Sequence, residues 1–185
     1  MRILGIDPGY AIMGWAVIDH NGNRFHPVDF GSVTTDAGME IPDRLQLLYS
    51  GLMGIIHEYS PEEASIEELF FNNNAKTVIH VGEARGVAIL ACVNCGLPVY
   101  EYTPLQIKQA LVGYGRAEKK QVQEMVKTIL HLEKVPKPDD TADAVAAAIC
   151  HAHASGSGRK REIDRILKDS KNSKAVRGLR IRKGI

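Results

Sequence analysis

Acidic residues stand at three separate places where the pattern of the chain leaves room for a ligand. Asp7 ends a short apolar run and is followed by the turn pair Pro8-Gly9, and Glu67 ends another short run. A third acidic group opens a helical segment and consists of Asp139, Asp140 and Asp143. Carboxylate oxygens are the ligands that Mg²⁺ and Mn²⁺ prefer. If the three places converge, they can hold two such ions about 3.5–4 Å apart and support hydrolysis of a phosphodiester.

The pattern leaves open which acids face one another. Glu67 has Glu68 as its neighbour, and strand alternation points the two side chains to opposite faces, so only one of them can join the site. In the helix, Asp143 is close enough to share a ligand either with Asp140 at i, i+3 or with Asp139 at i, i+4. Each group also has a purely structural explanation, as a turn, a solvated strand exit or a helix cap.

The elements that position these acids follow from the hydrophobic spacing. Short apolar runs predict strands at 2–7, 11–19, 24–32, 64–67 and 97–101. Apolar residues at helical spacing predict helices at 41–59, at 76–94, from 104, at 117–132 and from 139. Asn21-Gly22 is a hairpin turn, which makes the first three strands an antiparallel meander. We therefore predict an α/β fold in which helices flank a mixed five-stranded sheet, with a site at the carboxyl ends of its strands.

Five blocks of the sequence resemble the motifs of the RuvC family of Holliday-junction resolvases, which have a ribonuclease-H-like fold. The blocks are 5–9 (GIDPG), 65–70 (SIEELF), 82–88 (GEARGVA), 108–119 (KQALVGYGRAEK) and 140–144 (DTADA). The similarity is colinear from Met1 to about His153. It implies a RuvC-like nuclease domain over residues 1–154.

The resemblance implies roles that the spacing leaves open. The catalytic and metal-binding carboxylates are expected to be Asp7, Glu67, Asp140 and Asp143. They are expected to hold two Mg²⁺ ions per active site, with Mn²⁺ as a substitute, and to use water as the nucleophile. Lys108 and Lys119 are expected to neutralise charge near the scissile phosphate, and Phe70 to meet DNA bases near the junction. Without the resemblance, both lysines are solvated helix charges and Phe70 is a core or dimer-interface residue.

The resemblance also implies a function and partners. A chain of this family is expected to resolve four-way DNA junctions as a homodimer, by paired metal-dependent cuts in recombination and repair, and to work with the RuvA-RuvB branch-migration complex. One rival is an ATP-handling protein of the actin, Hsp70 and sugar-kinase superfamily, which shares an Asp-x-Gly turn but needs two such domains. A second rival is a non-catalytic junction-binding protein of the same fold.

Composition predicts the cellular location of the protein and distinguishes an acidic main part of the chain from a basic C-terminal segment. No apolar run reaches membrane length, and Asp7 comes too early for a signal-peptide core, so we expect a cytoplasmic protein without a membrane partner. The resemblance to RuvC implies that this protein is bacterial. Residues 156–185 hold 11 Lys or Arg against 3 Asp or Glu, whereas residues 1–155 hold 12 against 19. Such a basic segment is typical of an arm that contacts polyanions, and a solvated terminus is the alternative. We expect 155–185 to be a basic C-terminal extension, with a linker-like start that indicates flexibility.

Overall fold

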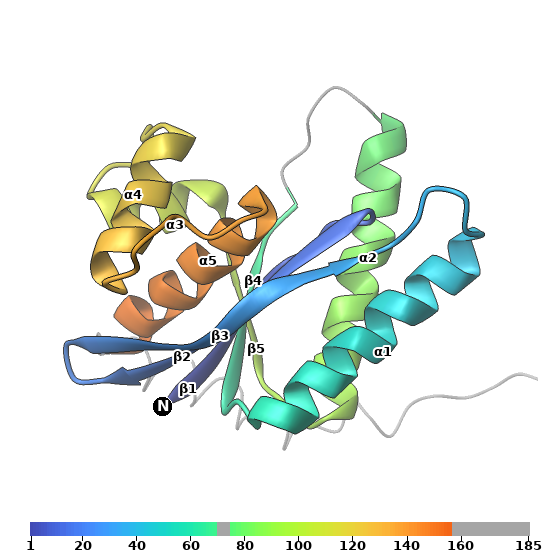
Figure 1. The fold of residues 1–185 in the computed structure, drawn as a ribbon, viewed down its shortest axis with the longest axis horizontal. Coiled ribbons are helices and arrows are strands. Elements are labelled where there is room, and N and C mark those ends of the chain that lie inside the picture. The colour runs from blue at the N-terminus through green and yellow to red at the C-terminus, as the bar shows by residue number, and fades with distance from the viewer. Residues whose placement is uncertain (70–74, 157–185) are drawn as a thin grey trace, which may run out of the picture. The chain divides into compact units, whose positions relative to one another are not determined.

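The computed structural model of the chain describes residues 1–69 and 75–156. The strands of this part are β1 (Arg2–Asp7), β2 (Ile12–Asn21), β3 (Arg24–Thr34), β4 (Glu63–Glu67) and β5 (Val99–Tyr102). The helices are α1 (Ile41–Tyr59), α2 (Ala75–Asn94), α3 (Pro104–Val112), α4 (Lys119–Ile129) and α5 (Asp139–Gly156). The strands form one sheet in the order β3-β2-β1-β4-β5, antiparallel from β3 to β1 and parallel from β1 to β5 (Figure 1). The predicted mixed five-stranded sheet is confirmed.

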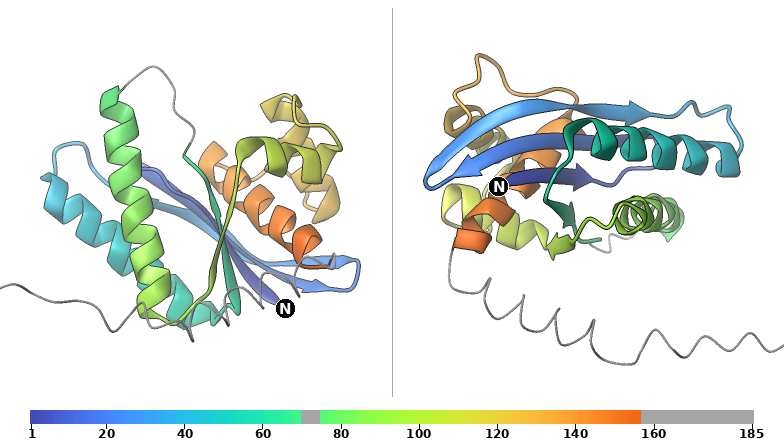
Figure 2. Two further views of the ribbon diagram at one scale, coloured as in Figure 1. Left: turned by 180° about the vertical axis from the view of Figure 1, so that it is seen from behind. Right: turned by 90° about the horizontal axis from the view of Figure 1, so that it is seen from below.

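Helices cover both faces of this sheet (Figure 2). The side chains of β1 alternate between two cores: Ile3 packs with residues of α3, α4 and α5, whereas Leu4 and Ile6 pack with residues of α1 and α2. Because alternate strand residues share a face, Gly5 and Asp7 lie on the side of α5. Within the described part of the chain, no helix combines the length and apolarity needed to cross a membrane.

Two predicted elements are shorter in the structure. The helix predicted over 117–132 runs only over Lys119–Ile129, because Glu118 forms a capping box with Gln121 and because His131 has a positive φ of 51°. The strand predicted from Leu97 begins at Val99, since the Leu97 amide still donates to the carbonyl of Cys92 at the end of α2.

Helix α5 lies directly against the backbone of the central strands. A Cβ on Gly14 would stand 2.0 Å from the carbonyl oxygen of Asp140, and a Cβ on Gly5 would stand 2.0 Å from that of Ala144. The buried Ser65 hydroxyl on β4 donates to the carbonyl of Ala147 at 2.7 Å. Two glycines and one hydroxyl thus fix how close the acidic start of α5 comes to the ends of β1 and β4.

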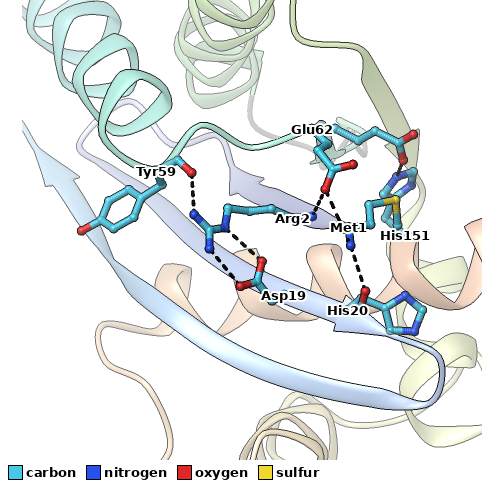
Figure 3. Close-up of polar contacts among 8 residues, drawn as sticks. Met1, Arg2, Asp19, His20, Tyr59, Glu62 and His151 are labelled. Carbon is cyan, nitrogen blue, oxygen red and sulfur yellow. Dashed lines mark hydrogen bonds and ion pairs between the residues drawn. The ribbon is translucent and has the colours of Figure 1, made fainter.

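Opposite charges are paired at the start of β1 (Figure 3). Nε and Nη2 of Arg2 each donate to a carboxylate oxygen of Asp19 at 2.9 Å, and Nη1 donates to the carbonyl of Tyr59 at 2.9 Å. The N-terminal ammonium donates to the carbonyl of His20 at 3.0 Å and lies 3.6 Å from a carboxylate oxygen of Glu62. These contacts tie the start of β1 to β2 and to the end of α1.

Candidate active site

Asp7 and Glu67 end two neighbouring parallel strands. The register pairs Ile6 on β1 with Ile66 on β4, and the two acids follow at the same edge of the sheet. Both line one hollow of about 330 Å³, which Asp143 of α5 also lines. The structure therefore brings together three of the four carboxylates singled out in the sequence.

Glu68 lines the same hollow, although strand alternation was expected to turn one of the two neighbouring glutamates away. A residue can line a hollow with its backbone, and of the two glutamates only Glu67 is among the charges that act on Asp7. Glu67 is therefore the glutamate that belongs electrostatically to the cluster around Asp7.

Burial and neighbouring like charges raise the pKa values of Asp7, Glu67 and Asp143. The pKa of Asp7 rises to about 8, first because the carboxyl is buried and then because Glu67, Asp143 and Asp140 repel a further negative charge. Burial and the charge of Asp143 raise the pKa of Glu67 to about 7. Burial likewise raises the pKa of Asp143, although Lys119 opposes the shift. The cluster thus holds more negative charge than the protein compensates.

Asp140 and Asp139 have different surroundings at the start of α5. Asp140 repels the charge of Asp7, and its Oδ1 would lie 3.8 Å from a Cβ on Gly9, so it faces the turn that follows β1. The carboxylate of Asp139 instead accepts from Lys137 at 2.6 Å, a bond that lowers its pKa. Of the two alternatives that the sequence left open, Asp140 is the one directed to the cluster.

Two lysines adjoin the acids from the other side. Lys108 of α3 and Lys119, the first residue of α4, line a hollow of about 240 Å³ together with Glu67 and Asp143. Nζ of Lys119 donates to Asp143 at 2.8 Å. Burial lowers the pKa of Lys119, but the hydrogen bond and the charge of Asp143 outweigh it and the pKa is raised. Lys119 therefore stays charged beside the acids.

The donor set fits a divalent cation that prefers oxygen ligands, such as Mg²⁺ or Mn²⁺. In residues 1–69 and 75–156, no three side chains of the types that bind metals stand close enough together to form a finished cage. Electrostatic repulsion keeps carboxylates apart when nothing lies between them, and Lys119 already bonds to one oxygen of Asp143. What suits the site to a cation is its uncompensated charge at one edge of the sheet.

Phe70, His151 and an aromatic pair are further residues to consider for a role in the site. Phe70 lies outside the described residues, so its expected contact with DNA bases stays a prediction. His151 is 2% exposed and bonds to the Tyr102 hydroxyl at 2.8 Å and to Glu63 at 2.6 Å, which makes it a packed histidine far from the acids along α5. An aromatic pair near Asp140, Tyr10 with His80, was not singled out in the sequence, because 69 residues separate its members and neither belongs to a motif.

Known proteins are similar to this chain in sequence and in fold. The family model described as crossover junction endodeoxyribonuclease RuvC matches residues 3–151. The RuvC of Caldanaerobacter subterraneus subsp. tengcongensis is 60% identical over 155 residues, which cover 84% of this chain and 94% of the relative. The solved structure of Thermus thermophilus RuvC has a TM-score of 0.80 and 34% identity, covering 85% of this chain and 97% of that one.

A second solved structure, Thermus thermophilus RuvC in complex with Holliday junction substrate, has a TM-score of 0.80 and 35% identity, covering 84% of this chain and 94% of that one. These matches confirm the predicted ribonuclease-H-like fold. The sequence and the fold together show that this chain belongs to the RuvC family of crossover junction endodeoxyribonucleases.

Proposed function

We propose that this protein is a metal-dependent endonuclease that resolves Holliday junctions, the substrate bound in the Thermus thermophilus complex. The observation that supports it best is the cluster of carboxylates around Asp7, where burial and mutual repulsion raise the pKa of Asp7 to about 8. A protein gains nothing in stability by assembling such a cluster, since repulsion between like charges costs free energy. A site that binds cations is the function that explains it.

In this proposal the divalent ions, two Mg²⁺ per active site with Mn²⁺ as a substitute, are held by Asp7, Glu67, Asp140 and Asp143. When bound, such ions lower the pKa of water and stabilise negative charge on a phosphate. The carboxylates would hold and orient the ions, and the environment raises the pKa of Asp7, to about 8, further than that of Glu67, to about 7. Lys108 and Lys119 offset the charge that develops on the phosphate as the strand is cut.

The protein is proposed to act as a homodimer that cuts two strands of the junction. Support comes from α2, where Ile79, Leu90 and Val93 are 59%, 52% and 60% exposed. Their spacing, with Gly86 between them, puts these side chains on one stripe of the helix. An exposed apolar stripe of this kind suits a second copy of the chain. Work with the RuvA-RuvB complex, a cytoplasmic location and the role of the basic segment 155–185 stay predictions.

Cleavage of synthetic DNA tests the proposal. The purified protein is incubated with a four-way junction and with linear duplexes made from the same arm sequences, each with Mg²⁺ and with EDTA. We expect the junction alone to be cut, and only with Mg²⁺. Binding of the junction without any cutting would instead favour the rival, a non-catalytic junction-binding protein, and equal cutting of the linear duplexes would contradict the junction as substrate.

A further inference from the structure

A third hollow adjoins the acid cluster and has a different character. It measures about 420 Å³ and is lined by Tyr10, Ile12, His80 and Val81 as well as by Asp140. Val81 also lines the hollow of Asp7 and Glu67, so the two hollows are neighbours. The carboxylates account for the chemistry of cutting, but they give no reason for two rings beside Asp140.

The two rings are held in place by the protein itself. Tyr10 and His80 stack with their centroids 4.8 Å apart and their planes at 21°. The guanidinium of Arg44 lies 3.8 Å from the centroid of the Tyr10 ring, and Arg44 is only 8% exposed. Its Nε donates to the Thr35 hydroxyl at 2.8 Å, and that hydroxyl donates to the Tyr10 carbonyl at 2.8 Å. Because the rings are fixed before any ligand arrives, little conformational entropy is lost on binding.

The charges around this hollow favour one kind of ligand. Asp140 is part of its lining, and Glu83 lies 3.0 Å from Nδ1 of His80. No lysine or arginine is among the described residues that line this hollow, so it offers a phosphate no cationic partner, whereas an uncharged flat ring can stack on the aromatic pair. Nucleobases have this chemistry, and stacking on aromatic side chains is how proteins commonly hold unpaired ones.

We propose that this hollow binds one unpaired base of the cut strand, close to the scissile phosphate, and that Tyr10 and His80 hold this base by stacking. The inference rests on the proposed function. Three adjoining hollows follow the edge of the sheet, the first with Lys108 and Lys119, the second with Asp7, and the third with the aromatic pair. A strand whose phosphate lies at the acids therefore extends toward the lysines in one direction and toward the rings in the other.

This inference is tested by combining substitutions in the protein with removal of single bases from the DNA. Junctions are made in which each nucleotide on either side of the scissile phosphate is in turn replaced by an abasic residue. The rate of first-strand cleavage in Mg²⁺ is measured with wild type, with His80→Ala and with the control His57→Ala. His57 is a matched control because it is an exposed histidine of α1 that lines a separate hollow at the end of that helix.

We expect one abasic position to slow wild type roughly tenfold, within the range that base–aromatic stacking provides. His80→Ala should slow cleavage of the intact junction by a similar factor, and the abasic position should then cost it little more. His57→Ala should behave as wild type throughout. Tyr10→Leu, which keeps an apolar side chain under Arg44, should reproduce the loss of sensitivity if His80→Ala proves unstable.

Other outcomes separate the inference from the proposed function. Equal abasic penalties in wild type and in His80→Ala would overturn the inference, as would the lack of any sensitive position, while cutting of the intact junction would leave the proposed function standing. A wild type that does not cut the intact junction would overturn both.

Discussion

At the start of β1, Arg2 and the N-terminal ammonium face Asp19 and Glu62, whereas at its end Asp7 faces three other acids and one lysine. The two ends of β1 therefore lie in different electrostatic environments. At the first end the chain supplies a partner for each charge, and hydrogen bonds connect β1, β2 and α1. At the second end the charges exceed what Lys119 can offset. The difference indicates that the charges at the start of β1 stabilise the fold, whereas those at its end suit the binding of a cation.

The largest expected difference is in cleavage rate, when one carboxylate is replaced at the end of β1 and one near its start. Asp7→Asn keeps the shape of the side chain but removes one charge from the cluster. We expect it to slow cleavage of a junction in Mg²⁺ by roughly 10³-fold, and to keep junction affinity, because the DNA surface is unchanged. Asp19→Asn is the matched change at the paired end and should leave the cleavage rate as it is. The rates come from single-turnover assays, and undiminished cutting by Asp7→Asn would refute the assignment.

The second-largest expected effect comes from a substitution that increases the distance between α5 and the sheet. A methyl group on Gly14 would meet the Asp140 carbonyl at 2.0 Å, so Gly14→Ala must move α5 away from β1 and β2. We expect it to lower the free energy of unfolding by about 3 kcal/mol and to slow cleavage roughly 10²-fold, since it displaces a carboxylate of the site.

Gly54→Ala is the control for that substitution. Gly54 lies in α1 with open space around its Cβ position, and alanine there should raise the stability by up to ~1 kcal/mol. Thermal unfolding and cleavage rates measured for both variants check the pair. Equal cleavage rates would mean that the contact of α5 with the strands does not position the acids.

The sequence predicted the frame of the site because that frame depends on hydrophobic alternation and on parallel pairing. Asp7 and Glu67 each end an apolar run, and two parallel neighbours must end at the same edge of the sheet. The acidic start of α5 was also apparent from the sequence. The choice between Asp140 and Asp139 followed only from the family resemblance.

Other features of the site depend on side-chain contacts that the spacing of residues in the sequence does not reveal. The carboxylate of Asp139 bonds to Lys137, a pair within a loop and a helix start that the sequence does not distinguish from other surface charges. Tyr10 and His80 stack only because α2 crosses beside the turn after β1. Side-chain contacts between distant elements require the angles and distances of the packed helices, which local patterns do not specify.

The two ends of β1 should also respond to pH with opposite signs. In metal-free protein, the folded pKa of Asp7 is about 8 against an ordinary value of 3.8. Between these values the folded state keeps a proton that the unfolded chain has lost, so the stability falls as the pH rises from about 4 to about 8. Because coupled acids share protons, we expect a loss on the order of 1–3 kcal/mol.

Thermal unfolding in EDTA measures this loss, with Asp7→Asn as the comparison. The variant lacks the titrating group, so its melting temperature should fall less over the same range, by roughly 2–4 °C for each kcal/mol. Adding Mg²⁺ at pH 8 should stabilise wild type more than Asp7→Asn, because binding to the folded state raises its stability. Parallel pH curves for the two proteins would show that Asp7 is not in a strained electrostatic environment.

The smallest effect belongs to the paired end. The hydrogen bond from Arg2 lowers the pKa of Asp19, so this carboxylate adds stability above its unfolded pKa and loses it as the pH falls through its folded pKa. The pair is partly exposed, with side chains 36% and 41% accessible, which limits its contribution to about 0.5–1 kcal/mol. Asp19→Asn should lower the free energy of unfolding by that amount at pH 7, and by less in high salt, where exposed pairs are screened. Asp19→Asn could instead lower the free energy of unfolding by more than Asp7→Asn raises it at pH 8. That result would contradict the comparison, because charge interactions would then affect stability more at the start of β1 than at its end.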